Sequence, residues 1–329
     1  MAGITALGTT YNLPNYTGIL HQLTPSDTPF FSAIGGLSGG GQTNSIEFEW
    51  QTFDLRAAGQ NTRLEGADAP AEEERVRANV SNLVQIHQET VGVSYTKLAA
   101  TQAKAGINNA ESNPVTNELD WQTEQMLKQM VRDVEYSFIR GTYGKPADNT
   151  TARKTRGLLE AITTNVIAAP DGDDVGEGTQ PSALTEALVL DLLQKTWDNG
   201  GIQESETATL MCNAWQKRQL TRIFVADKNY REESRNVGGV SVQTVETDFG
   251  RLNIMLNRHM PADQVAVVSL EQCMPVFQEI PGKGHFFAEP LARTGAKDRT
   301  QLYGEVGLAY GNERTHGKIT NLATTPLAA

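Results

Sequence analysis

The pattern of apolar and polar positions changes from irregular to alternating near residue 46. Ile46, Phe48 and Trp50 alternate with polar residues, which is typical of a β-strand with one buried face. Phe53 and Leu55 continue the apolar series one position out of phase. Because a one-residue shift moves side chains to the opposite face, the sequence predicts a strand with a β-bulge.

A second strand pattern, from Ala71 to Thr96, contains no proline, and its only glycine is Gly92. It predicts a single strand of about twenty residues, against about five or six in a typical strand. The segment between the two patterns is polar, small and acidic, so a projecting hairpin with a mobile tip is expected. Because an isolated two-stranded ribbon is only marginally stable in water, we expect this hairpin to lie on another molecule.

Residues 1–45 show little sign of regular structure. Prolines and glycines are mixed there with isolated apolar residues, including Tyr11, Leu20, Phe30 and Phe31. Disordered tails lack such apolar anchors. The segment is therefore expected to be an extended arm that is pinned against a partner.

The clearest helical pattern spans residues 114–140, after a short Ala-rich helix at 97–105. Its apolar residues recur at spacings of four and seven, which predicts one buried stripe. Asn113 is expected to cap this helix, with Pro114 at the first helical position and Gly141 at its end.

Helix and strand patterns alternate between residues 181 and 280, which predicts an α/β subdomain. Strand character returns in residues 281–329, and the chain as a whole is expected to be α+β. The expected elements of the subdomain are a helix at 183–200, a strand at 207–213, a helix at 214–225, two strands around 248–250 and a strand at 263–270.

Composition and charge restrict the function. The hydrophobic content of 39% and charged content of 20% are ordinary for a folded protein, and no apolar run is long enough to span a bilayer. The net charge is −11, and residues 1–96 contain no lysine, which disfavours sequence-directed binding to nucleic acid. Cys212 and Cys273 lie in apolar contexts and are expected to be buried free thiols of a reducing compartment.

A search for catalytic residues yields only weak candidates. Ser38 in the sequence GLSGG matches a nucleophile pattern, but that motif needs a preceding strand and a following helix, whereas a glycine-rich linker is expected here. The histidines are dispersed, and the acidic loop at 171–177 departs from the EF-hand pattern. No cofactor is expected. A soluble hydrolase that uses Ser38 or an acidic metal site is the alternative from a different functional class.

Several segments resemble the major capsid proteins of tailed phages, whose shared architecture is the Hong Kong 97-type fold. They are LTPSDTPFFSAIGG, EFEWQTFDLR, RLEGADAP, RANVSNLVQIHQETVGVSYT and the ending GEVGLAYGNERTHGKITNL. The resemblance covers nearly the whole chain and is most specific in residues 23–96. It implies a structural protein, not an enzyme, that forms pentamers and hexamers of an icosahedral shell around double-stranded DNA. The shell would be part of the virion and would assemble in the host cytoplasm.

An encapsulating nanocompartment, whose shell protein has the same fold, is the near alternative to a phage capsid.

The resemblance also implies a division of the chain into domains. The implied parts are an N-terminal arm (1–45), an extended loop (46–96), a peripheral domain with a spine helix (97–180, helix 114–140), an axial domain (181–280) and closing strands of the peripheral domain (281–329).

The expected partners are further copies of the chain, a portal protein and packaged DNA that is bound without sequence specificity; no membrane is expected. A decoration protein is a further possible partner. Since the chain starts directly at the arm, a separate scaffolding protein, or none, is implied. Some relatives cross-link their shells through a lysine of the extended loop, but no lysine precedes Lys97 here. The candidate subunit-interface residues are Tyr11, Leu20, Phe30, Phe31, Trp50, Arg56, Arg63, Glu65, Asp68, Glu72, Glu73, Glu74, Arg75 and Arg77.

Overall fold

The computed structural model of the protein describes residues 26–100, 117–148, 150–169, 181–202, 208–223, 233–237 and 240–325. The chain divides into two compact units. The first unit contains described residues from 87–132 and 286–303, and the second contains those from 28–86, 133–285 and 304–329. Helix α3 (Glu118–Arg140) and strand β13 (Lys297–Ala309) contribute residues to both units.

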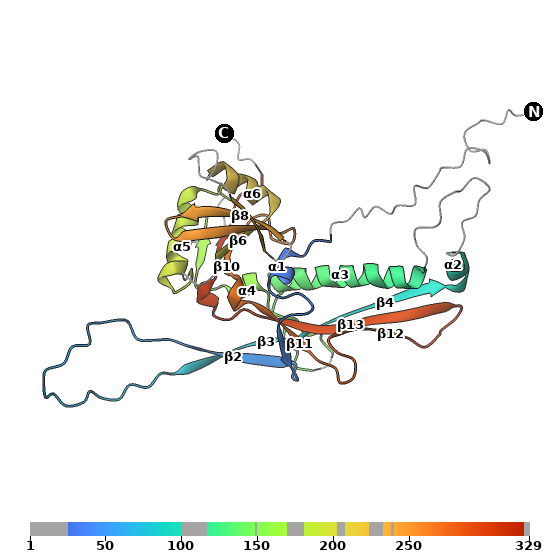
Figure 1. The fold of residues 1–329 in the computed structure, drawn as a ribbon, viewed down its shortest axis with the longest axis horizontal. Coiled ribbons are helices and arrows are strands. Elements are labelled where there is room, and N and C mark those ends of the chain that lie inside the picture. The colour runs from blue at the N-terminus through green and yellow to red at the C-terminus, as the bar shows by residue number, and fades with distance from the viewer. Residues whose placement is uncertain are drawn as a thin grey trace, which may run out of the picture. The chain divides into compact units, whose positions relative to one another are not determined.

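The second unit is built around a seven-stranded mixed sheet with helices α5 (Glu186–Asp198) and α6 (Ala214–Thr221) beside it (Figure 1). Strands β6 and β10 are buried along their whole length, as expected for apolar runs covered on both faces. The helices and strands predicted for residues 181–270 are confirmed. In sheet order the strands are β5 (Val166–Ala168), β14 (Gly317–Thr320), β10 (Val265–Ser269), β6 (Ala208–Cys212), β9 (Gly250–Leu256), β8 (Val240–Thr247) and β7 (Glu233–Val237).

The limits of this sheet differ from the limits predicted for the α/β subdomain. Strands β5 and β14 come from outside residues 181–280, and β11 (Met274–Gln278), which lies inside that range, pairs in another sheet. Ile167 and Ile319 of the two added strands are buried in the same core as Leu192 of α5. Distant segments therefore complete the core, which no local pattern could indicate.

A two-stranded ribbon of β2 (Glu47–Phe53) and β3 (Arg77–Leu83) also belongs to the second unit. Its antiparallel register runs without interruption from Glu47 opposite Leu83 to Phe53 opposite Arg77, so the predicted bulge is wrong. Thr52 continues the half-buried face, and Phe53 lies on the other face with 66% of its surface exposed. The apolar shift in the sequence reflects exposed apolar residues and not a change in backbone register.

The prediction of one continuous strand from 71 to 96 is also wrong. Strand β3 ends at Leu83, and β4 (Gln85–Ser94) starts after Val84, which is fully buried and donates its N–H to the carbonyl of Ile46 at 3.0 Å. Strand β3 pairs with β2, whereas β4 pairs with β13. The chain changes partners at Val84, so the long strand pattern is shared between two sheets.

The sheet that contains β4 has five strands. Strand β13 pairs with β11 and β12 (Phe286–Pro290), and β1 (Gly41–Thr43) pairs in parallel with β11. The remaining described helical segments are short. They are α1 (Pro29–Ala33), α2 (Tyr95–Ala100), α4 (Leu158–Ala161), η2 (Leu270–Gln272) and η3 (Glu313–Thr315).

Helix α3 confirms the predicted long helix with a later start. Asn117 accepts hydrogen bonds from the N–H groups of Leu119 and Asp120 and so caps the helix, while Asn113 and Pro114 lie outside the described residues. The helix ends before Gly141, as predicted. Only glycine fits at this position, because a β-carbon there would lie 2.3 Å from the carbonyl oxygen of Ser137. Among the described helices, none combines the length and apolar character needed to cross a bilayer.

Candidate functional site

The ribbon of β2 and β3 is fixed at its root by a buried amide. Asn82 is fully buried, and its Nδ2 donates to the carbonyl oxygens of Leu308 at 2.7 Å and Arg156 at 3.1 Å. Its Oδ1 accepts from the N–H groups of Arg156 and Leu83, both at 2.8 Å. One side chain therefore satisfies four backbone groups and holds β3 to two other segments of the second unit.

Aromatic contacts hold β2 to the segment that contains Tyr310 and Gly311. The Nε1 of Trp50 donates to the carbonyl of Gly311 at 2.7 Å, and its ring meets Tyr310 edge-on with centroids 4.9 Å apart. A β-carbon at Gly307 would lie 2.6 Å from the carbonyl of Leu83 and 2.7 Å from the ring of Phe48, so only glycine allows this approach. The indole and the phenol thus set the direction in which the ribbon leaves the unit.

A charged pair adds to the root. Lys145 Nζ lies 2.5 Å from Glu47 Oε2, and this hydrogen bond holds the pKa of Glu47 below its ordinary value. The guanidinium of Arg156 lies over the ring of Tyr143 at 4.4 Å and donates to the Tyr310 hydroxyl at 3.1 Å. The base of the ribbon is therefore ordered by contacts within its own subunit.

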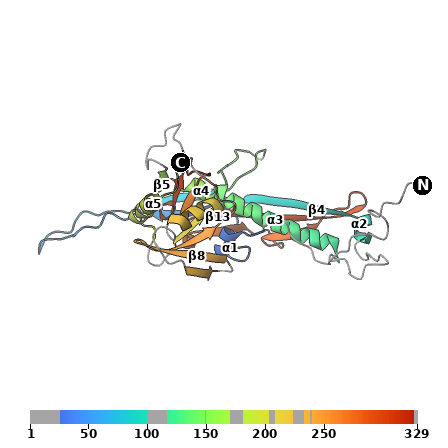
Figure 2. The ribbon, with the colours of Figure 1, turned by 90° about the horizontal axis from the view of Figure 1, so that it is seen from above.

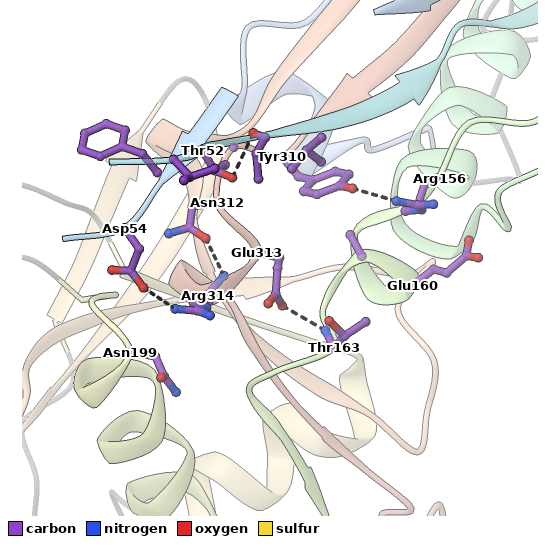
Figure 3. A pocket seen from close by; sticks show the side chains of 16 residues that line it. Thr52, Asp54, Arg156, Glu160, Thr163, Asn199, Tyr310, Asn312, Glu313 and Arg314 are labelled. Carbon is purple, nitrogen blue, oxygen red and sulfur yellow. Dashed lines mark hydrogen bonds and ion pairs between the residues drawn. The ribbon is translucent and has the colours of Figure 1, made fainter. Parts of the chain in front are cut away.

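An open groove of about 720 Å³ lies beside the root (Figure 3). Residues at the ends of β2 and β3 form one side, and the segment around η3 forms another, with Arg314 bound to Asp54 at 3.3 Å. Burial raises the pKa of Glu313, but hydrogen bonds from Thr164 and Thr163 outweigh this effect, so its pKa lies below the ordinary value. The groove is lined by charges of both signs and by apolar side chains such as Phe53, Val76 and Val80.

The ribbon loop, residues 54–76, differs sharply from the root. It extends away from the seven-stranded sheet in both views of the second unit (Figures 1 and 2). Glu73 binds Arg75 at 3.0 Å and lies 4.0 Å from Arg56, and Arg77 donates to Gln51 at 3.0 Å. The other charged candidates in the loop are exposed and form no ion pair among the described residues: Arg63, Glu65, Asp68, Glu72 and Glu74.

Large apolar side chains accompany these charges in the loop. Leu55 is 71% exposed, Leu64 is 84% exposed and Val76 is 83% exposed. Single exposed apolar residues are common on protein surfaces, so each of these three side chains is available to a partner but none identifies one. The contact of this hairpin with another copy of the chain, which the sequence predicts, stays a prediction.

Two of the predicted interface residues are placed in the core of their own subunit. Phe30 and Phe31 are 0% and 2% exposed, and their backbone N–H groups donate to the Glu135 carboxylate at 3.0 and 2.6 Å. The ring of Phe31 packs edge-on against Phe138 with centroids 5.7 Å apart. Their assignment as inter-subunit anchors is corrected, because both side chains are already covered. Tyr11 and Leu20 lie outside the described residues.

Sequence reasoning missed the residue that organises this anchor. Glu135 is fully buried and also accepts a hydrogen bond from Asn257 Nδ2 at 2.5 Å. A buried carboxylate requires several donors. Its signal in the sequence was an acidic residue beside Val134 on the apolar stripe of the predicted helix, a place where a solvent-exposed acid is not expected.

No catalytic arrangement emerges in the part of the chain that the structure describes. Ser38 follows α1 and precedes β1, the reverse of the strand–helix order that a nucleophile elbow needs. No three metal-ligating side chains gather among the described residues, and the acidic loop at 171–177 lies outside them. Burial raises the pKa of the Cys212 thiol to about 12 and that of Cys273 still further, so both free thiols are unreactive.

The buried histidines are structural as well. His316 is fully buried, accepts from the N–H of Ser269 at 3.2 Å through Nδ1, and donates to the carbonyl of Tyr310 at 2.9 Å through Nε2. Burial lowers its pKa to about 4, and it does the same for His87. Both imidazoles are therefore neutral at pH 7.

Comparison with known proteins adds a family and a set of solved structures. The family model described as SU10 major capsid protein matches residues 3–323. A search of curated protein sequences finds no match. The chain of the cyanophage A-1(L) capsid asymmetric unit is 12% identical, with a TM-score of 0.63 over 98% of this chain and 100% of that chain.

Two further structures are similar at the same level. A chain from Mycobacterium phage Cain is 13% identical, with a TM-score of 0.59 over 96% of each chain. A chain of the holo-SrpI encapsulin complex from Synechococcus elongatus is 12% identical, with a TM-score of 0.61 over 96% of this chain and 95% of that chain. At such low identity the likeness shows the fold alone, and this is the α+β, Hong Kong 97-type fold that the sequence resemblance implied.

Proposed function

Because the chain belongs to the SU10 major capsid protein family and is a structural protein of an icosahedral phage capsid, we propose that its copies form pentamers and hexamers in a shell around double-stranded DNA. Self-association into the shell and a location in the virion capsid follow from the family. The proposal adds the type of capsomer and the enclosed genome, and places assembly in the host cytoplasm.

The observation that carries the proposal is the contrast within the ribbon. Its root is held by Asn82 and Trp50, yet its loop presents exposed apolar side chains and several carboxylates that form no ion pair within the described chain. A ribbon with exposed edges needs a partner, and identical copies supply the same partner surface in every subunit.

The domain roles also belong to this proposal. Residues 1–45 would act as the arm, 46–96 as the extended loop and 181–280 as the axial domain, with the peripheral domain formed by 97–180 and 281–329. The contacts of Phe30 and Phe31 with Glu135 support the arm role, because they attach this part of the arm to the core of the second unit. The buried stripe of α3 supports a spine role for that helix.

The acidic chain suits a container for DNA. With a net charge of −11, the inner surface would repel the phosphate backbone and leave the genome mobile during packaging and release. We propose a portal protein and a separate scaffolding protein as partners, with a decoration protein as an optional one, and neither a cofactor nor a catalytic activity.

A shell that encloses proteins instead of DNA is the second candidate. The likeness to the encapsulin complex favours it, because that structure shares the fold at a similar TM-score. The two candidates differ in cargo. Particles purified from infected cells would contain nuclease-protected DNA in the first case and a specific protein in the second.

Expression of the full chain followed by negative-stain electron microscopy and analytical ultracentrifugation tests the function. The expected result is closed, uniform particles with a large sedimentation coefficient. A chain that remains monomeric at every protein and salt concentration, with or without a co-expressed scaffolding protein, would contradict a shell-forming role.

A further inference from the structure

A second groove of the second unit, of about 510 Å³, lies along α6 and is here called the α6 groove. The groove beside the ribbon root is lined by acids and bases, whereas no acid is among the described residues that line the α6 groove. The polar side chains that line it can all donate hydrogen bonds: Arg218, Gln219, Arg222 and Thr325. This composition favours an anionic ligand.

The two arginines keep their charge available to a ligand. Both are exposed, and neither forms an ion pair with a described residue. The guanidinium of Arg218 lies 5.8 Å from the ring centroid of Trp215, which leaves its positive charge uncompensated. Cations at the C-terminal end of a helix complement the helix dipole. That local role does not require a groove whose described lining is free of acids.

Hydrogen bonds fix the wall of the α6 groove around Ala323. The indole Nε1 of Trp215 and the amide Nε2 of Gln216 both donate to the carbonyl of Ala323 at 3.0 Å. Gln216 is fully buried and also donates to the carbonyl of Ala262 at 2.8 Å. Asn213 caps α6 by accepting from the N–H of Gln216 at 2.9 Å. The groove is therefore ordered before any ligand binds, which lowers the entropy cost of binding.

The spacing of the arginines suits a chain of phosphates. Arg218 and Arg222 are four residues apart on one face of α6, about 6 Å along the helix axis. Each strand of duplex DNA carries one phosphate per about 3.4 Å of its own axis. Two cations at the helical spacing can thus contact phosphates of one strand, and each guanidinium can bind a phosphate through two parallel hydrogen bonds.

We propose that the α6 groove binds the phosphate backbone of the packaged double-stranded DNA. This inference rests on the proposed function and names the surface through which each subunit meets the genome. Because the chain as a whole carries a net charge of −11, binding stays weak and salt-sensitive. It does not select a sequence, since contacts to phosphate carry no information about the bases.

An acidic peptide is the other class of anionic polymer that a basic groove could hold. A peptide brings backbone N–H donors as well as carboxylates, and those donors need acceptors in the groove. The phosphates of DNA only accept hydrogen bonds, and the guanidinium groups of Arg218 and Arg222 only donate them. This match favours the DNA backbone.

Removing the two charges tests the proposal. The groove variant carries Arg218→Gln and Arg222→Gln. The control variant carries Arg293→Gln and Lys297→Gln in the turn between β12 and β13, where both residues are exposed, so the two variants have the same net charge. Fluorescence anisotropy of a labelled DNA duplex of mixed sequence measures binding to unassembled full-length subunits, from low to physiological salt.

We expect the control variant to bind the duplex as the wild type does. The groove variant should bind about tenfold more weakly at low salt, and its slope of log affinity against log salt should be smaller by about two. A charge-conserving variant, Arg218→Lys and Arg222→Lys, should keep the wild-type slope but bind less tightly, because an ammonium group cannot form the two-pronged hydrogen bond.

Competition identifies the class of ligand. Unlabelled duplex should displace the probe at a lower concentration of negative charge than polyglutamate or inorganic phosphate. Stronger displacement by polyglutamate would assign the groove to an acidic protein partner, and stronger displacement by inorganic phosphate would assign it to a free anion. Either result would overturn the proposal.

Three further outcomes contradict the proposal: no wild-type binding at low salt, equal binding by the wild type and the groove variant, or an equal loss in the control. If circular dichroism shows that the groove variant is unfolded, Arg222→Gln alone provides the test, and its slope should be smaller by about one. Particles from infected cells that contain no DNA would instead contradict the proposed function, which the assay on unassembled subunits does not measure.

Discussion

The root and the loop of the β2–β3 ribbon differ in where their polar groups find partners. At the root, Asn82 makes four hydrogen bonds and Trp50 makes one, all within the subunit. In the loop, Leu64 and Val76 are more than four-fifths exposed, and several carboxylates have no ion-pair partner in the described chain. The root is explained by the fold of a single subunit, whereas the exposed groups of the loop are the ones that the proposed contact between subunits would use. Perturbing each region should therefore affect a different measurement.

The largest effect on the subunit is expected where the arm meets the core. Phe31→Ala should lower the free energy of unfolding by about 3–5 kcal/mol, because it empties a buried site against Phe138. Deletion of residues 1–34 should destabilise the subunit further, because it removes the buried side chains of both Phe30 and Phe31. Chemical denaturation of unassembled subunits measures both changes. A loss below about 1 kcal/mol in either chain would mean that α1 contributes little to the core.

The root should be the next most sensitive site. Asn82→Ala leaves two carbonyl groups and two N–H groups without their partner in a buried place, which should cost about 3 kcal/mol of stability. Asn79→Ala on the same strand is the matched control, since Asn79 is exposed and donates only to Glu49. Its effect should stay below about 0.5 kcal/mol. Similar losses from both substitutions, measured by denaturant unfolding, would show that the root is not organised by Asn82.

The stability of the subunit should also depend on pH through His316, which donates to the carbonyl of Tyr310 beside Trp50. The folded-state pKa of His316 is lowered to about 4, so the unfolded chain binds a proton that the folded chain does not. Its contribution is complete above about pH 6.5 and is lost as the pH falls toward 4, which amounts to about 2 kcal/mol between pH 6.5 and 5. His87 adds a loss of the same sign. Unfolding free energies measured at several pH values test this, and a flat profile over that range would contradict a neutral buried His316.

The loop should show only small effects in the free subunit. Arg63→Ala should change the unfolding free energy by less than about 0.5 kcal/mol and act on shells, where an exposed ion pair contributes about 0–1 kcal/mol at each contact. Arg75→Ala differs, because Arg75 binds Glu73 in its own loop. Thermal and salt stability of assembled shells should fall more for Arg63→Ala than for Arg75→Ala. Unchanged shells in both cases would remove the loop arginines from the interface.

The sequence predicted the local elements better than their partners. The helix ending at Gly141, the alternation of helix and strand after residue 181 and the buried cysteines are confirmed, because each depends on periodicity or on neighbouring residues. The break at Val84 could not be predicted, because it arises from a change of sheet partner. Apolar type alone could not distinguish Phe30, which is buried in its own core, from Leu64, which is exposed in the loop. That distinction depends on Glu135, a residue more than a hundred positions away from Phe30.

The smallest expected effect concerns covalent linkage between subunits, which should be absent. The ribbon loop contains no lysine, and Lys145 at the root is bound to Glu47 of the same subunit at 2.5 Å. Cys212 and Cys273 are buried, with thiol pKa values raised by burial, so neither thiol can form a disulfide with a neighbour. Mature particles boiled in detergent should release a single band near 35.8 kDa, with or without reductant. A ladder that persists in reductant would reveal an amide-type link, and one that disappears in reductant would reveal a disulfide. Either result would contradict this prediction.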